Sequence, residues 1–198
     1  MNKDEIIEKA SIMFLNLGFK SVTMDDIAND FSISKKTLYL HFKNKEELVK
    51  RCTFYIFNKI SLEIDAVFNE GKNPIQELFD VKELVLKNLK DEKSSPIYQL
   101  QKYYPKIYVS LKKLQFEKIE TCMSLNLTRG ITQGLYRKNI NPFVISRFYF
   151  NGMIGIKDTE MFPSLKFLPR EVQKCFLEYH LRGICTKDGI KTLEKLLT

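Results

Sequence analysis

Hydrophobic residues recur every three or four positions along most of the chain, which is the spacing of one helix face. Strict alternation of apolar and polar residues, the pattern of a half-buried strand, is nearly absent. The first helical face is formed by five residues near the N-terminus: Ile6, Ala10, Met13, Phe14 and Leu17. Gly18 follows them as a helix-ending glycine. The pattern predicts an all-α protein.

Capping residues divide the pattern that follows into two short helices and a long one. Thr23 precedes acidic residues and is predicted to cap a second helix, and Ser34 is predicted to cap a third over residues 35–42. A long helix is predicted over residues 45–69. Because no linker separates it from the short helices, the long helix is expected to act as a hinge.

The rest of the chain carries signals for further helices. They are predicted from Pro74 to about Lys90, from Ser94-Ser95-Pro96 to Pro105, over residues 106–136, from Pro142 to Ile156, from Pro169 to Ile184, and after Gly189. We therefore expect two domains: a three-helix head in residues 1–50 and a larger helical body in residues 51–198.

The two short helices, separated by Phe31-Ser32-Ile33, have the spacing of a helix-turn-helix at about residues 24–43. In this motif the second helix enters the major groove of duplex DNA. Leu38 and Phe42 are four positions apart and are predicted to face the core of the head. The other positions of that helix offer cations, hydrogen-bonding groups and one apolar side chain able to meet a thymine methyl. They are Lys35, Lys36, Thr37, Tyr39, Leu40, His41 and Lys43.

The charge distribution agrees with this segment as a binding surface. The chain has a net charge of +8, but residues 1–50 carry eight lysines and eight acidic residues, so the surplus lies beyond the head. Within the head, residues 31–50 carry five lysines and two acidic residues (5 − 2 = +3). One of these lysines, Lys45, lies at a predicted helix start, where backbone N–H groups attract phosphate. A nucleic-acid partner is therefore expected to meet this end of the head.

Two segments of the head carry a recognisable pattern. Residues 18–28 carry the pattern G-x-x-x-x-T-x-x-x-I-A, and residues 34–48 carry S-x-x-T-L-Y-x-H-F-x-x-K-E-x-L. With these patterns the head resembles that of the TetR/AcrR-type transcriptional regulators. The typed positions agree in register over most of residues 5–50. One position departs from the pattern, because the usual turn glycine is Ser32 here. The body resembles the family only in the layout of its helices.

The resemblance implies a role for individual residues of the head. Five would contact the DNA backbone: Thr23, Thr37, Tyr39, His41 and Lys45. Three would occupy the positions where base choice is usually made: Lys35, Lys36 and Leu40. The resemblance also implies that the body binds a small molecule, which moves the long helix and displaces the two reading helices of a dimer.

Aromatic residues that follow the long helix are the candidates for an effector pocket. Its wall is predicted to include Tyr103, Tyr108, Phe116 and Cys122. The expected effector is a small apolar or cationic molecule of unknown identity, and no cofactor is expected. Aromatic residues at helical spacing are also typical of an ordinary core, so that alternative stays open for these residues.

The late helices are predicted to form a two-fold dimer interface. The run from Phe143 to Ile156 is too hydrophobic on all sides for a solvent-facing helix, and residues 170–184 offer a second apolar face. Paired across an axis, the two helices would complete a four-helix bundle. The residues predicted in this interface are Phe143, Phe148, Gly152, Phe176 and Tyr179.

Other function classes have little support. The chain has two histidines and lacks a phosphate-binding loop, a G-x-S-x-G motif, an H-E-x-x-H motif and a C-x-x-C pair, so neither an enzyme nor a metal site is expected. Its first residues lack the apolar segment of a signal peptide, and no apolar run is long enough for a bilayer, so we expect a cytoplasmic protein with reduced thiols and no membrane partner. A redox-sensing cysteine and a ligand carrier with an inert head are the alternatives.

The sequence is interpreted as a DNA-binding transcriptional regulator. Its expected form is a ligand-responsive repressor that binds a palindromic operator in double-stranded DNA as a homodimer. Repression is expected because it is the commoner activity in the family that the head resembles.

Overall fold

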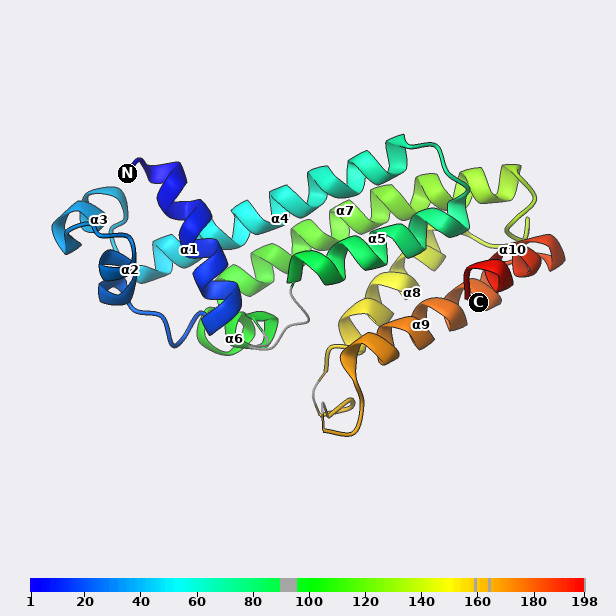
Figure 1. Cartoon of the computed structure of the whole chain (residues 1–198). Coiled ribbons are helices and arrows are strands. Elements are labelled where there is room, and N and C mark those ends of the chain that lie inside the picture. The colour runs from blue at the N-terminus through cyan, green and yellow to red at the C-terminus, as the bar shows by residue number, and fades with distance from the viewer. Residues whose placement is uncertain (90–95, 159, 164, 198) are drawn as a thin grey trace. The chain divides into compact units, whose positions relative to one another are not determined.

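The computed structural model describes residues 1–89, 96–158, 160–163 and 165–197. Within these ranges it contains ten α-helices, and the predicted all-α class is confirmed (Figure 1). Their bounds are α1 (Lys3–Leu17), α2 (Met24–Asp30), α3 (Lys35–His41), α4 (Lys45–Asn69), α5 (Pro74–Leu89), α6 (Pro96–Tyr103), α7 (Pro105–Thr132), α8 (Pro142–Gly155), α9 (Pro169–Ile184) and α10 (Lys187–Leu197). The predicted starts at Ser94-Ser95 and end at Lys90 lie outside the described residues.

The starts of the short helices follow the capping residues. The hydroxyl of Thr23 accepts a hydrogen bond from the backbone N–H of Asp26 at 3.1 Å, and the carboxylate of Asp26 accepts one in return from the Thr23 N–H at 2.8 Å. The hydroxyl of Ser34 accepts from the N–H of Thr37 at 2.9 Å. Both predicted caps are confirmed, and they satisfy N–H groups that the first helical turn leaves unpaired.

The chain forms two compact units. The first consists of Met1–Leu62 and Asn88–Gln115, and the second of Glu63–Lys87 and Phe116–Thr198. The first unit therefore contains more than the expected head, because α6 and the beginning of α7 belong to it. The predicted boundary at residue 50 stays a prediction, since a contact unit need not be the smallest part that folds alone.

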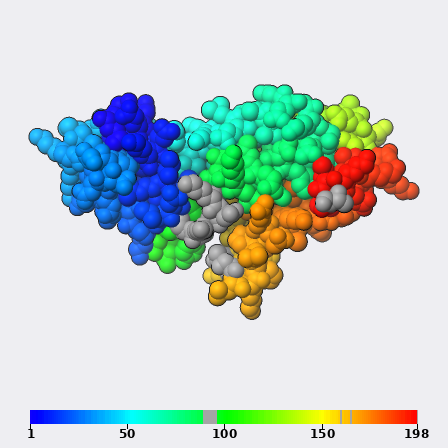
Figure 2. Space-filling model, viewed as in Figure 1, coloured from blue at the N-terminus to red at the C-terminus, as the bar shows by residue number. Residues whose placement is uncertain are grey.

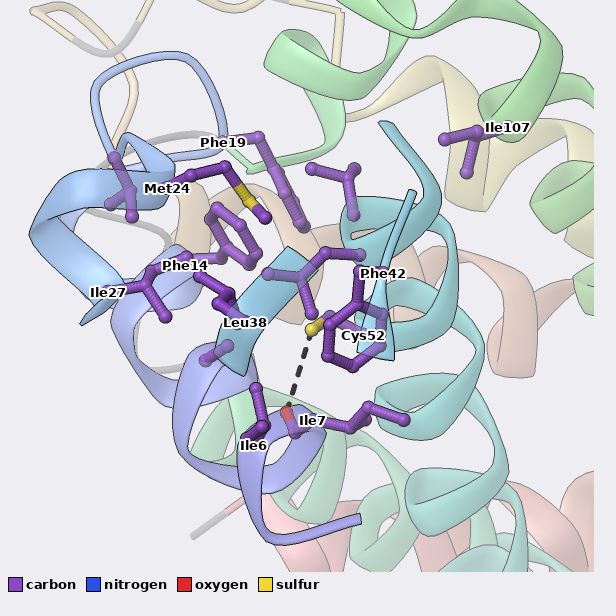
Figure 3. Close-up of a cluster of buried hydrophobic side chains, with 14 of the residues drawn as sticks. Ile6, Ile7, Phe14, Phe19, Met24, Ile27, Leu38, Phe42, Cys52 and Ile107 are labelled. Carbon is purple, nitrogen blue, oxygen red and sulfur yellow. Dashed lines mark hydrogen bonds between the residues drawn. The ribbon is translucent and has the colours of Figure 1, made fainter. Parts of the chain in front are cut away.

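The core of the first unit explains why α6 and α7 belong to it. Side chains from α1, α2 and α3 converge on Cys52 of α4, whose thiol donates a hydrogen bond to the carbonyl of Ile7 (3.5 Å; Figure 3). Leu100 from α6 and Ile107 and Leu111 from α7 are buried in the same cluster. Burial of the apolar side chains of this cluster is the main stabilising term for the first unit.

The second unit has its own core, built from α5, the later part of α7, and α8 to α10. Its centre contains a polar cluster. The carboxylate of Glu77 is fully buried and accepts hydrogen bonds from the guanidinium of Arg129 and, at 3.0 Å, from the side-chain amide of Asn126. The hydroxyl of Tyr136 donates to the other end of the Asn126 amide at 3.1 Å. The charge of Glu77 is thus paired and hydrogen-bonded where water is excluded.

The end of α7 differs from the sequence prediction. The helix ends at Thr132 and not at residue 136, because Gly134 adopts a left-handed φ of +73° and turns the chain. Tyr136 then pairs its backbone with Cys185 in an isolated bridge. Gly189 also differs: it lies inside α10 and not before it, against the carbonyl of Leu135.

Candidate nucleic-acid interface

Helices α2 and α3 are joined by a tight turn. The N–H of Ser32 donates to the carbonyl of Asn29 at 3.1 Å, and the N–H of Ile33 donates to that of Ala28 at 3.0 Å. Ser32 has a φ of 53°, and no other non-glycine residue in the described chain has a positive φ. The serine thus adopts the left-handed turn that a glycine usually supplies, at a cost of about 1 kcal/mol. The helix-turn-helix is formed despite this departure from the family pattern.

The two sides of α3 differ as the spacing predicts. Leu38 and Phe42 are fully buried in the core of the first unit. On the opposite side Lys36 is exposed, and Tyr39 and Leu40 are 44% and 76% exposed. These three side chains are open to solvent, so this side of α3 is available to a partner. In the space-filling view, the light-blue segment that contains α3 lies at the surface (Figure 2).

The remaining predicted contacts of α3 are engaged within the head. The ammonium group of Lys35 forms an ion pair with Asp25 of α2 at 2.8 Å, and this carboxylate raises the pKa of the lysine. The hydroxyl of Thr37 is 2.7 Å from that of Ser34. His41 is half-buried, with its ring 6.2 Å from that of Phe42.

Lys45 holds the start of α4 against the loop before α2. Its ammonium group donates to the backbone carbonyl of Lys20 at 3.0 Å. Desolvation by partial burial lowers the pKa of Lys45, and the charge of Asp26 opposes that effect. Thr23, the cap of α2, follows Lys20 by three residues. The structure therefore brings together at one end of the head three elements predicted to face DNA: the start of α2, α3 and the start of α4.

Two acidic residues of this surface were missed by the sequence reasoning. Asp25 and Asp26 were assigned only to the first turn of α2, where acids favour the helix dipole. In the structure, Asp25 also pairs with Lys35, and Asp26 lies near Lys45. The pairing of Asp25 with Lys35, ten residues later, could not be predicted from the sequence, because helical periodicity does not extend across the turn between their helices.

The four residues predicted for the effector pocket lie in different surroundings. Tyr103 is 38% exposed and Tyr108 packs against the core of the first unit. Phe116 belongs to the second unit and meets Phe150 edge-on, with ring centroids 5.2 Å apart. Cys122, also in the second unit, is half-buried, and burial raises the pKa of its thiol. The pocket stays a prediction, and the packing of Tyr108 and Phe116 also fits the core alternative.

The residues predicted for dimerisation form two groups. Phe143, Phe148 and Tyr179 are 62%, 64% and 79% exposed. Gly152 and Phe176 instead contact each other within the chain, where a Cβ on the glycine would collide with the phenylalanine ring. This contact lets α8 and α9 approach closely. Because Phe176 already contributes to the core of its own unit, the exposed residues are the better probes of an interface.

The thiols and the helices provide two further facts. The four cysteines are free, and burial raises the pKa of Cys52 to about 12 and that of Cys185 to about 11. These two thiols are therefore protonated, and poorly reactive, at neutral pH. Among the helices that the structure describes, none has both the length and the apolar content of a membrane span.

Known proteins are similar to the head in sequence and to most of the chain in fold. The model of the family described as bacterial regulatory proteins, tetR family, matches residues 6–52. The biofilm operon icaADBC HTH-type negative transcriptional regulator IcaR of Staphylococcus aureus (strain Newman) is 29% identical over 146 residues, with 59% of this chain and 77% of the relative covered.

Two solved structures extend the likeness to the body. A transcriptional regulator from Cytophaga hutchinsonii has a TM-score of 0.73 at 21% identity, over 92% of this chain and 98% of that chain. A complex of SmeT with triclosan has a TM-score of 0.66 at 15% identity, over 93% and 92%. SmeT is described as the repressor of the Stenotrophomonas maltophilia multidrug efflux pump SmeDEF. The head is therefore that of the tetR family of bacterial regulatory proteins, the similarity to a negative transcriptional regulator reaches into the body, and the fold is that of a solved transcriptional regulator.

Proposed function

We propose that this regulator represses transcription by binding a palindromic operator as a homodimer, and that a small molecule bound to the body releases it. The main support for DNA recognition by α3 is the exposure of one side of this helix. Lys36, Tyr39 and Leu40 are exposed there, while the other side of the helix is buried. Repression is supported by the similarity to IcaR, a negative regulator. The head matches a family of regulatory proteins, which supports an activity based on binding and not on catalysis.

The binding test separates base contacts from phosphate contacts. Tyr39→Ala is expected to weaken binding to every sequence by a similar factor, because a phosphate contact positions the protein without reading bases. Lys36→Ala should change sequence preference as well as affinity, by about 1–3 kcal/mol if the lysine meets a guanine. Fluorescence anisotropy with the protein's own upstream DNA, and with a panel of single-base variants, measures both effects.

Lys59→Ala is the matched control for this test. Lys59 is exposed on α4, fourteen residues beyond Lys45 and hence about 21 Å along the helix. This variant loses the same charge but is expected to bind as the wild type does. If the Tyr39 and Lys36 variants also bind like the wild type, α3 is not the reading helix.

The dimer is proposed to form through the exposed apolar residues of α8 and α9. Phe148→Asp should convert it to a monomer, because an unpaired carboxylate would be buried at a self-complementary interface. Sedimentation velocity gives the mass in solution, and thermal unfolding verifies that the variant is folded. Leu62→Asp, which changes another exposed apolar residue outside these helices, is the control. A dimer that persists in the Phe148 variant would place the interface elsewhere.

An effector is proposed to act through α4, which is about 37 Å long and belongs to the first unit at one end and the second at the other. A small tilt of this helix would move the head by several ångströms. The proposal is supported by the triclosan complex of SmeT, a protein of the same fold. Linkage requires that DNA weaken effector binding by the factor by which the effector weakens DNA binding.

A thermal-shift screen of apolar and cationic compounds, followed by titration of the best compound with and without operator, tests this coupling. A compound that binds equally well in both titrations is not an effector, since equal affinity shifts no equilibrium.

A further inference from the structure

Helix α6 is fixed to the loop between α1 and α2, within the first unit. The side-chain oxygen of Gln99 accepts a hydrogen bond from the backbone N–H of Lys20 at 2.9 Å. Gly18 has a φ of +88°, and a Cβ at this position would collide with the amide of Gln99. The loop therefore approaches α6 as closely as a glycine permits, and α6 lies beside the end of α1 (Figure 1). The side-chain amide of Gln99 thus fixes α6 to the loop at both Gly18 and Lys20.

Two lysines meet at this junction around a single tyrosine. The ammonium group of Lys20 is 4.8 Å from the ring centroid of Tyr103, and that of Lys102 is 5.6 Å from the same centroid. Lys102 also lies 5.6 Å from the ring centroid of Tyr98 and donates to its hydroxyl at 3.4 Å. The tyrosines are 46% and 38% exposed, so the group is open to solvent. We call these four residues, Lys20, Tyr98, Lys102 and Tyr103, the basic corner.

The basic corner lacks a negative partner in the protein. In the part of the chain that the structure describes, neither Lys20 nor Lys102 forms an ion pair with a carboxylate. Residues 96–115 contain four lysines and no acidic residue. The cation–π contacts hold the lysines in place but leave most of their N–H donors available to water or to a ligand. Donation from Lys20, together with the charge of Lys102, lowers the pKa of Tyr103, which agrees with a local preference for negative charge.

The location of the basic corner relates it to DNA. Lys20 precedes Thr23, the cap of α2, by three residues, and its carbonyl accepts the hydrogen bond from Lys45 of α4. The corner is therefore attached to the two helix starts that are expected to meet the DNA backbone. Two ammonium groups and two hydroxyls match a phosphate, whose oxygens accept several hydrogen bonds at once.

We propose that the basic corner binds a backbone phosphate of the operator beside each half-site, a contact supplied by α6 from outside the helix-turn-helix. This proposal rests on the proposed binding of DNA by the head. The contact is independent of sequence, because it reaches no base edge. It would extend the phosphate contacts of each half-site beyond the segment that reads bases.

The test is the salt dependence of DNA binding by the full-length protein. Lys102→Gln should lower affinity for operator and for a scrambled duplex by the same factor, about five- to tenfold per bound subunit near 0.1 M salt. The slope of log affinity against log salt should fall by about 0.9 per subunit. Tyr103→Phe keeps the ring under both lysines but removes a hydroxyl, so it should cost roughly two- to tenfold with an unchanged slope. In phosphate ethylation interference, ethylation of one phosphate per half-site should weaken binding by the wild type but not by the Lys102 variant.

Lys59→Gln is the control, since it removes an exposed lysine of the same unit that lies about 21 Å along α4 from Lys45, the residue that contacts Lys20. Equal slopes in the Lys59 and Lys102 variants would overturn the proposal, because Lys102 would then contribute only to the general electrostatic attraction between protein and DNA. Loss of binding in the Tyr39 and Lys36 variants together with wild-type binding in the Lys102 variant would refute the basic corner alone. Wild-type binding in the α3 variants would instead refute the proposed function.

Discussion

Replacing Arg129 with methionine should lower the free energy of unfolding by about 3–5 kcal/mol, because the substitution leaves a buried carboxylate without its counter-charge. Glu77 is fully buried, and Arg129 is the cation that meets it. The amide of Asn126 would still donate to Glu77, but that amide also donates to the carbonyl of Pro74 at 2.8 Å and carries no charge. Urea unfolding, monitored by far-ultraviolet circular dichroism, gives the change in midpoint.

A second substitution separates charge from packing in this cluster. Glu77→Gln in the Arg129→Met background removes the uncompensated charge and should recover more than half of the loss. Arg182→Met is the matched control, because Arg182 pairs with Glu178 on the surface of α9, where an exposed i,i+4 pair contributes only about 0.3–0.5 kcal/mol. Similar losses in the Arg129 and Arg182 variants would mean that burial of Glu77 does not govern the stability of this unit.

The stability of the second unit should fall as the pH is lowered from about 6.5 to about 4. The ring of His180 is buried against Tyr149, with centroids 4.9 Å apart, and its Nε2 atom has no hydrogen-bond partner within the described chain. Burial lowers the pKa of His180 to about 4, against 6.5 for the unperturbed group. In this window the unfolded chain binds a proton that the folded chain does not. The folded state is therefore favoured above pH 6.5 and loses up to about 3 kcal/mol by pH 4.

His180→Leu isolates this contribution from the carboxylates that titrate near the same pH. The difference in unfolding free energy between wild type and variant should change by about 3 kcal/mol between pH 7 and pH 4, in favour of the variant at the acidic end. The measurement is urea unfolding at half-unit pH intervals. Parallel curves for the two proteins would show that His180 becomes protonated in the folded state without penalty.

The sides of single helices could be predicted from the sequence. Leu38 and Phe42 are buried and Leu40 is exposed because a period of 3.6 residues assigns each position of α3 to one side. Thr23 and Ser34 cap helices because their hydroxyls reach N–H groups two or three residues away. These properties depend only on neighbouring residues, and they identified which side of α3, the helix proposed to read DNA, is exposed.

Contacts between elements could not be predicted in the same way. Lys35 pairs with a residue of the preceding helix, and Lys20 meets an aromatic residue of α6 far along the chain. The core of the head includes Leu100 and Ile107, which no local pattern assigns to it. Such contacts depend on the turn at Ser32 and on the packing of whole helices, and periodicity carries no information about either. For the same reason the sequence predicted a helix as far as residue 136, whereas α7 ends at Thr132 and Tyr136 lies beyond it.

The ion pair between Lys35 and Asp25 should weaken the attraction of the protein to DNA of arbitrary sequence. A regulator meets roughly a million or more incorrect sites for each correct one, and it is held on all of them by attraction between lysines and phosphates. A lysine of α3 that is already neutralised by a carboxylate 2.8 Å away adds little to that attraction. The pair should therefore shorten the time that the protein spends on arbitrary DNA. At the operator, base contacts made by neighbouring side chains do not depend on this attraction, so residence there is less affected.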